Sequence, residues 1–164
     1  MVGAGPFGEM FFCHCGDCRR WHGSLCAGSV VQRHQLDVSP DASLSWFKNP
    51  TSERHASRAF CCTCGSNLFW VPEEGHLVCI AAGTLDQPSG LKRTRHLFVS
   101  QRADYWSYQD DLPGAPEASA WRTPRGRTQP VMRMGLAIDS VSDDGGNTAC
   151  FESAHPSVNL PGRH

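Results

Sequence analysis

The sequence predicts an all-β fold, a small domain of antiparallel strands. Short apolar runs of about four to eight residues, rich in Val, Phe, Trp and Ile, recur along the first two thirds of the chain. Pro, Gly, Asn and Asp separate the runs, as is typical of the turns between strands. Convincing helical periodicity, with apolar residues recurring every three or four positions, is absent.

Each expected strand is one such run bounded by turn residues. The first, Leu25–Val31, precedes a turn-like stretch. The others, in chain order, are Leu44–Lys48, His55–Phe60, Asn67–Val71, Leu77–Ala82 and Thr94–Val99. The best helical candidate is one short turn around Asp17–Gly23, which follows a group of cysteines.

The composition changes after Asp110. Six of the 11 prolines and six of the 16 glycines lie beyond it, and apolar residues there are scattered, apart from Val131–Ile138, which could form one strand. Such a segment buries too little apolar surface to fold alone. We therefore expect a folded domain over residues 1–117 and a low-complexity, mostly disordered tail over residues 118–164.

Size and charge exclude several classes of protein. The chain has 164 residues, of which 40% are hydrophobic, enough for one domain with a core. Its formal net charge is -1 and it has no basic stripe, so nucleic acid is not an expected partner. No apolar run approaches the roughly 18 residues of a membrane helix. Residues 1–12 lack the basic and apolar regions of a signal peptide. The sequence predicts a soluble cytoplasmic protein.

The cysteines favour metal binding over a disulfide framework. There are nine, an odd number. Five of them form a C-x-C-x-x-C group, Cys13, Cys15 and Cys18, and a C-x-x-C group, Cys61 and Cys64. Cysteines two residues apart are poorly placed to pair with each other, so a cytosolic metal-binding protein is the preferred interpretation.

Cys13, Cys15 and Cys18 are the strongest candidates for metal ligands. Their spacing bends the backbone so that the thiolates converge, as a tetrahedral zinc ion requires at about 2.3 Å from each sulfur. Three ligands would leave the fourth position open, which is typical of a catalytic zinc. One further protein ligand would close the site and make it structural. The spacing alone leaves both alternatives open.

Cys61 and Cys64 form a second knuckle and supply half of a structural site. Gly65 suits the left-handed backbone often needed after a metal-binding turn. Either a further cysteine pair completes this site, or Cys61 and Cys64 join Cys15 and Cys18 in one four-thiolate site. The separation between the two pairs is longer than in a typical zinc ribbon.

Charged side chains surround the first cysteine group. Arg19 and Arg20 could hold a substrate carboxylate or offset thiolate charge, although a solvated basic pair is the simpler alternative. His14 and His22 could support the metal ligands or act as acid–base catalysts. Surface exposure is the alternative for His14, and packing in the turn for His22.

These motifs together resemble the glutathione-dependent formaldehyde-activating enzyme family, also called the GFA/CENP-V domain family. The matching stretches, in the family's order, are 13–20 with Gly23 and Ser24, 58–69, 83–86, 96–98 and 106–113. The match covers roughly residues 10–117. The resemblance implies a tent-like zinc domain of stacked small sheets. It also implies a carbon–sulfur lyase activity that joins formaldehyde and glutathione into S-hydroxymethylglutathione, or cleaves that adduct.

The family's functional residues map onto the two cysteine groups. The resemblance implies that Cys13, Cys15 and Cys18 are catalytic zinc ligands and that Cys61 and Cys64 are half of a structural zinc site. In the family the other half is a C-x-C on the first strand, about twenty residues upstream. The twelve residues before Cys13 contain no cysteine. We therefore expect a domain that lacks this first strand.

Two functions follow as hypotheses. The first is a zinc-dependent lyase whose partner is glutathione or another small thiol, with Arg19 or Arg20 holding a carboxylate of that ligand. The second is a non-catalytic structural zinc module that binds another protein, which the missing cysteine pair favours because a single four-thiolate site would use all the ligands.

Overall fold

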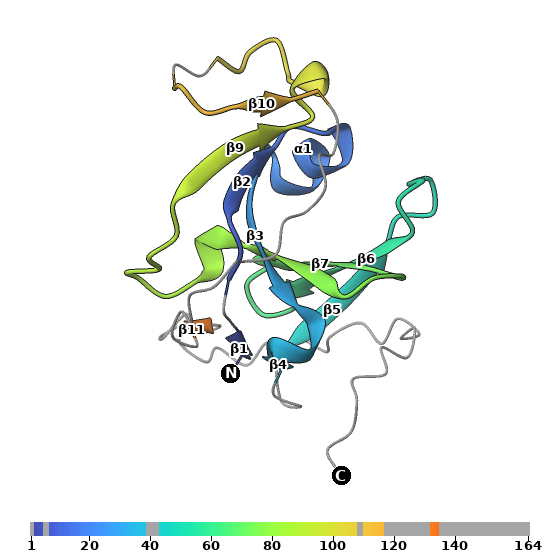
Figure 1. Ribbon diagram of the computed structural model, residues 1–164. Coiled ribbons are helices and arrows are strands. Elements are labelled where there is room, and N and C mark those ends of the chain that lie inside the picture. The colour runs from blue at the N-terminus through green and yellow to red at the C-terminus, as the bar shows by residue number, and fades with distance from the viewer. Residues whose placement is uncertain (1, 5–6, 39–42, 108–109, 117–131, 135–164) are drawn as a thin grey trace.

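The computed structural model confirms the all-β class. It describes residues 2–4, 7–38, 43–107, 110–116 and 132–134, whose regular elements are mostly strands, with one α-helix and three short 3-10 turns (Figure 1). In this part of the chain no helix is long and apolar enough to cross a membrane. Most of the expected tail, residues 118–164, lies outside the described residues, so its predicted disorder and the division into domain and tail stay predictions.

Most of the strands belong to one eight-stranded sheet in the order β10-β9-β2-β3-β8-β7-β6-β5. β9 runs parallel to both β2 and β10, while the other neighbours are antiparallel. The predicted antiparallel arrangement therefore holds except around β9. The strands are β2 (Met10–Cys13), β3 (Cys26–Gln32), β5 (Leu44–Lys48), β6 (Ala56–Cys61), β7 (Asn67–Pro72), β8 (Leu77–Ala81), β9 (Arg93–Leu97) and β10 (Gly114–Ala115).

A second, three-stranded antiparallel sheet has the order β11-β1-β4. Its strands are β1 (Val2–Ala4), β4 (Leu36–Val38) and β11 (Met132–Met134). β11 falls within the segment 131–138 that the sequence predicts as a strand. It pairs with β1, so the two ends of the described chain meet in this small sheet.

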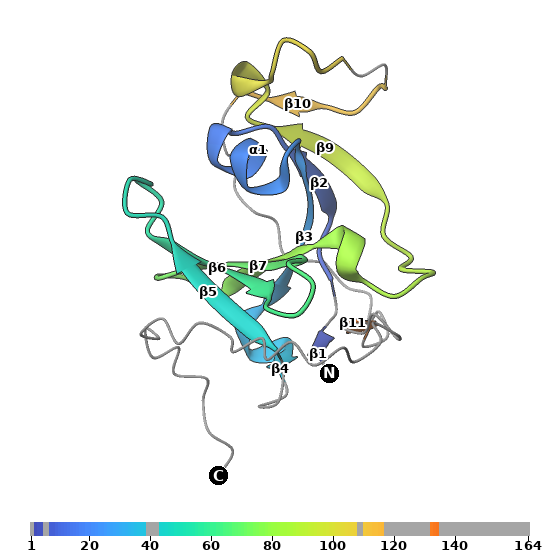
Figure 2. The same cartoon turned by 180° about the vertical axis from the view of Figure 1, so that it is seen from behind.

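Two halves of the large sheet run in different directions. Figure 1 and the reverse view in Figure 2 show β9, β2 and β3 rising steeply, whereas β5, β6 and β7 run across them. The helix α1 (Gly16–His22) follows β2 directly and lies beside β2 and β3 in both views. It corresponds to the expected turn at Asp17–Gly23 and ends at Gly23, whose φ of 72° is in the left-handed region that glycine favours.

The buried side chains form two clusters, and the cysteine groups are divided between them. Cys13 and Cys15 lie in the cluster formed by Phe11, Cys13, Cys15, Cys26, Val30, Cys79 and Leu97. Cys61 lies in the other, which is formed by Phe7, Val31, Ala59, Cys61, Leu68, Phe69, Val71, Val78, Ile80 and Leu85. The two knuckles are therefore parts of different regions of the core.

Gly28 on β3 allows close packing against the cluster that contains Phe11 and Cys79. A Cβ at this position would lie 2.8 Å from the Sγ of Cys79 and 2.9 Å from Cζ of Phe11, closer than packed atoms tolerate. We expect Gly28→Ala to lower the free energy of unfolding by about 1–3 kcal/mol, the usual cost of overpacking. Urea denaturation measures the change. Gly83→Ala is the matched control, because its Cβ would meet no atom within 4 Å. Equal losses in the two variants would contradict the steric explanation.

Candidate metal centre

Three cysteine side chains converge where β2 passes into α1. The Sγ atoms of Cys13, Cys15 and Cys18 all lie within 4.8 Å of one another. Cys15 is the N-cap of the helix, and its Sγ accepts a hydrogen bond from the backbone N–H of Cys18 at 3.4 Å. The helix start therefore brings Cys15 and Cys18 together, and the end of β2 adds Cys13.

The three sulfurs suit a thiolate-binding metal ion. Tetrahedral coordination at about 2.3 Å would place them roughly 3.8 Å apart, so small movements suffice. Hydrogen bonds to Cys15 and Cys18 raise the pKa of Cys13, whereas hydrogen bonds from Cys13 and Cys15 lower that of Cys18. The thiols thus share protons and do not all ionise together. A bound cation removes this restriction because it stabilises all three thiolates. The cluster could hold a metal ion.

Cys26 is a further sulfur beside this cluster. It pairs with Cys13 in the register of β2 and β3, is buried, and acts to raise the pKa of Cys18. It does not belong to the group of sulfurs that all lie within 4.8 Å of one another. Among the described residues that group consists of Cys13, Cys15 and Cys18 alone.

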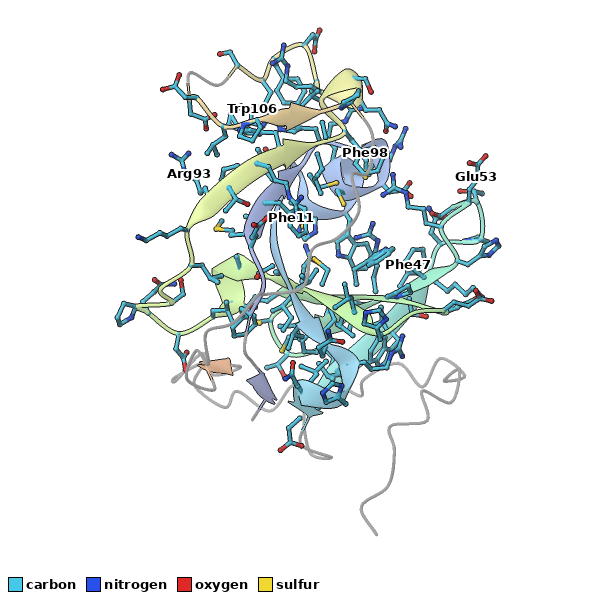
Figure 3. All side chains as sticks on the ribbon, in the orientation of Figure 1. Phe11, Phe47, Glu53, Arg93, Phe98 and Trp106 are labelled. Carbon is cyan, nitrogen blue, oxygen red and sulfur yellow. The ribbon has the colours of Figure 1, made fainter. Side chains whose placement is uncertain are left out.

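A cavity of about 270 Å³ adjoins the cluster. Both Cys13 and Cys18 line it, so two of the three thiols face a space that a small ligand could fill. In Figure 3, Phe11 on β2 and Phe98 just after β9 come from the same half of the large sheet. The remaining lining is mainly aromatic and aliphatic: Phe11, Trp21, Cys26, Leu68, Phe69, Trp70, Cys79, Ala81, Leu97 and Phe98, with His22, Arg54, Arg58 and Asn67 as polar members.

His22 at the end of α1 presents a neutral imidazole to this cavity. Burial lowers its pKa to about 4, and the positive charge of Arg58 acts in the same direction. The Nδ2 of Asn67 lies 3.4 Å from His22 Nδ1 and also donates to the backbone carbonyl of Trp21 at 3.2 Å. If the amide donates to Nδ1, the ring proton is on Nε2. His22 is then an uncharged hydrogen-bond donor near the thiols.

The structure places Arg19 and Arg20 away from this cavity. Arg20 is exposed, and Arg19 lines a separate small pocket with Tyr105 and Trp106. The guanidinium groups that line the large cavity belong instead to Arg54 and Arg58. Arg58 is part of the 58–69 motif, but its position in the sequence offers no reason to assign it a role. The predicted ligand-binding role of Arg19 and Arg20 has no support from this placement.

The second knuckle stays separate from the first. Cys61 is 1% exposed and belongs to the other core cluster, whereas Cys64 is exposed and its Sγ lies 3.1 Å from Ser66 Oγ. Among the described residues, Cys61 and Cys64 do not join Cys15 and Cys18 in a metal-binding group. The four-thiolate alternative therefore does not form. The metal-binding role of Cys61 and Cys64 stays a prediction.

A buried hydrogen-bond chain supports the first cysteine loop. His14, between two of the thiols, is 2% exposed rather than on the surface. Its Nε2 lies 2.8 Å from Nδ1 of His96, whose Nε2 lies 3.2 Å from Oδ1 of Asp110. Burial lowers the pKa of His14, and its neighbour His96 adds to the shift. The sequence motifs contain all three residues, but their separation along the chain hides the contact.

The comparisons with known proteins identify one family. A model of the glutathione-dependent formaldehyde-activating enzyme family matches residues 4–101, more than half of the chain. Curated protein sequences give no significant match. Among solved structures, the chain is similar to a crystal structure of a Rhodobacter sphaeroides protein from a structural-genomics programme. The identity is 19% and the TM-score 0.40, over 57% of this chain and 100% of the other. On the evidence of the family model, this chain belongs to the glutathione-dependent formaldehyde-activating enzyme family.

Proposed function

We propose that this protein is a zinc-dependent enzyme of the carbon–sulfur lyase type. It joins formaldehyde to glutathione or a related small thiol, or cleaves the resulting adduct. The observation that carries the proposal is the position of the thiol cluster: Cys13 and Cys18 belong both to the three-sulfur group and to the wall of the adjoining cavity. A purely structural metal site needs no such cavity.

Cys13, Cys15 and Cys18 would hold the zinc ion. Thiolates are ligands that zinc favours, and a three-ligand set is typical of catalytic sites. When bound, zinc lowers the pKa of a thiol in its coordination sphere and so supplies a thiolate at neutral pH. The family membership supports this choice of metal.

The reaction needs one new bond and one proton transfer. The thiol sulfur bonds to the carbonyl carbon of formaldehyde, the C=O π bond opens, and the proton lost from the thiol ends on the oxygen. His22 can donate a hydrogen bond from Nε2 to that oxygen because its imidazole stays neutral well below pH 7. The apolar walls exclude water and hold the two reactants together, which raises the rate through proximity. Cleavage of the adduct runs through the same steps in reverse.

Two further assignments belong to the same proposal. Cys61 and Cys64 would form half of a structural zinc site whose other ligands are not among the described residues. A cytoplasmic location would keep the seven free cysteines of the described chain reduced.

The expected result is faster exchange of formaldehyde between its free and thiol-bound forms. Zinc-loaded protein should raise the exchange rate of ¹³C-formaldehyde with glutathione, measured by NMR exchange spectroscopy, above the spontaneous rate. His22→Ala should reduce that increase by about 100-fold, the low end of the range for general acid–base groups. His76→Ala is the control, since His76 is exposed and does not line the cavity.

Binding of the thiol is tested separately by isothermal titration calorimetry. If zinc-loaded protein neither binds a small thiol nor changes the exchange rate, the lyase proposal is wrong and the structural zinc module becomes the better interpretation. If exchange is accelerated equally in the wild type and in His22→Ala, the lyase proposal stands, but His22 has no part in the proton transfer.

A further inference from the structure

Two guanidinium groups line a cavity whose walls are otherwise mainly apolar. Arg58 on β6 is only 7% exposed, and Arg54 lies in the loop between β5 and β6, half-buried. Neither forms an ion pair with a carboxylate of the described residues. A buried cation normally requires an anion nearby, because its loss of hydration is otherwise uncompensated. Among the described residues, the thiol cluster is the negative group beside Arg58, and a bound ligand could supply an anion to Arg54.

The guanidinium of Arg58 lies beside the thiol cluster and can balance its negative charge. Its Nη2 lies 3.9 Å from the Sγ of Cys18, and its Cζ lies 5.5 Å from the centre of the Trp21 ring. Three thiolates and one divalent cation together carry a net charge of about -1. One guanidinium is enough to balance this charge. With Arg58 beside the cluster, Arg54 has no carboxylate partner within the described part of the chain.

Arg54 is held in position by an aromatic ring. Its Cζ lies 4.2 Å from the centre of the Phe98 ring, within the range of a cation–π contact. The neighbouring Ser52 hydroxyl donates to Asp17 Oδ2 at 2.8 Å and fixes the same loop against α1. The Phe98 ring lies against the face of the guanidinium, and no hydrogen bond to a described residue engages its planar fork of N–H groups, which can therefore take a ligand. A fork of this kind matches a carboxylate.

We propose that Arg54 binds the carboxylate of the substrate, and that the cavity takes a thiol adduct with an apolar body and a single carboxylate. The inference rests on the function proposed above and names its substrate class. The adduct sulfur lies at the cysteine cluster, the apolar body lies against the aromatic wall, and the carboxylate pairs with Arg54. Trp21, Trp70 and Phe69 offer such a body a dry surface. Glutathione fits this wall less well, because the described lining contains no carboxylate to pair with its ammonium group.

The test compares acidic and neutral forms of one ligand. Isothermal titration calorimetry on zinc-loaded protein measures the Kd of 2-benzyl-3-mercaptopropanoate, of its primary amide and of glutathione. We expect the acid to bind about 10- to 100-fold more tightly than the amide, the usual range for a hydrogen-bonded charge pair. It should also bind more tightly than glutathione.

Variants of Arg54 test whether this residue causes the difference in affinity between the acid and the amide. Arg54→Met should reduce the ratio of acid to amide affinity to about one while leaving the affinity for the amide within about twofold. Arg54→Lys should keep part of the ratio, because it retains the charge but loses the fork. Lys92→Met is the control: it removes an exposed cation outside the cavity and should keep the wild-type ratio. Since Arg54 is in a loop, these variants should fold, which circular dichroism checks.

The outcomes separate this inference from the proposed function. An unchanged acid-to-amide ratio in Arg54→Met overturns the carboxylate site, whether or not thiols bind. Tighter binding of glutathione than of the benzyl acid overturns the apolar substrate class. The sulfur-free 3-phenylpropionate provides the last comparison. If it binds in an Arg54-dependent way while no thiol binds more tightly than it does, the carboxylate site holds and the thiol chemistry fails.

Discussion

Replacing Cys15 with Ser is expected to reduce the bound metal from about one ion per chain to close to none. Three thiolates are the minimum set for a stable zinc site of this type, and a hydroxyl is a poor substitute because it stays protonated at neutral pH. Cys15 is also the N-cap of α1, but a serine can fill that role, so the substitution tests the metal rather than the helix. Elemental analysis of purified protein gives the metal content per chain.

Two comparisons make this result specific. Cys26→Ala removes the neighbouring buried sulfur and should leave the metal bound, because Cys26 is outside the three-sulfur group. If Cys26→Ala also loses the metal, the fourth position is closed by a protein ligand and the site is structural. Circular dichroism of the Cys15 variant gives the second comparison. A folded protein that lacks a readily exchanged metal supports the catalytic role, whereas loss of the fold together with all metal supports the structural one.

Replacing His96 with Leu is expected to lower the free energy of unfolding by about 2–4 kcal/mol. The substitution leaves Nε2 of His14 and the carboxylate of Asp110 without this partner, and each buried polar group left unpaired costs about 1–3 kcal/mol. Asp110 keeps its ion pair with Arg93 at 3.3 Å, which limits the loss on that side. The cysteine loop should also bind metal more weakly, because His14 lies between two of its ligands.

Urea denaturation and a competition assay with a zinc chelator measure these two effects. His34→Leu is the matched control, since His34 is exposed and should change the free energy of unfolding by no more than about 0.5 kcal/mol. Asp110→Asn should lie between the control and His96→Leu, because an amide can still accept from the imidazole. If His96→Leu and His34→Leu behave alike, the buried chain does not stabilise the fold or the metal site.

The middle strands were predictable because each is one continuous, mainly apolar run of residues bounded by turn residues. Leu44–Lys48 agrees with β5, and the expected runs at 55–60, 67–71 and 77–82 coincide closely with β6, β7 and β8. β2 was not predicted. Its Met-Phe-Phe-Cys run is only four residues long and pairs on both edges, with β3 and with β9, so it shows no polar face and no alternation.

The candidate site likewise combines residues that could be predicted from the local sequence with residues that could not. The thiol cluster was predictable because residues 13–18 form one short turn, and spacing within a turn dictates where side chains point. Arg54, Arg58 and His96 could not be assigned in this way, since they reach the site from other strands and loops. The adjacent Arg19 and Arg20 were the natural candidates for the ligand-binding cations, but proximity in sequence did not place them in the cavity.

Features that depend on neighbouring residues could therefore be predicted from the sequence alone. These are the all-β class, most of the strands, the family and the three candidate metal ligands. The tertiary structure decided which core each cysteine knuckle joins, which cations enter the cavity and which histidines are buried together. The physical reason is that strand pairing brings together residues far apart in the sequence, such as Phe12 on β2 and His96 on β9. Side-chain direction across such a distance depends on the register of every strand between them.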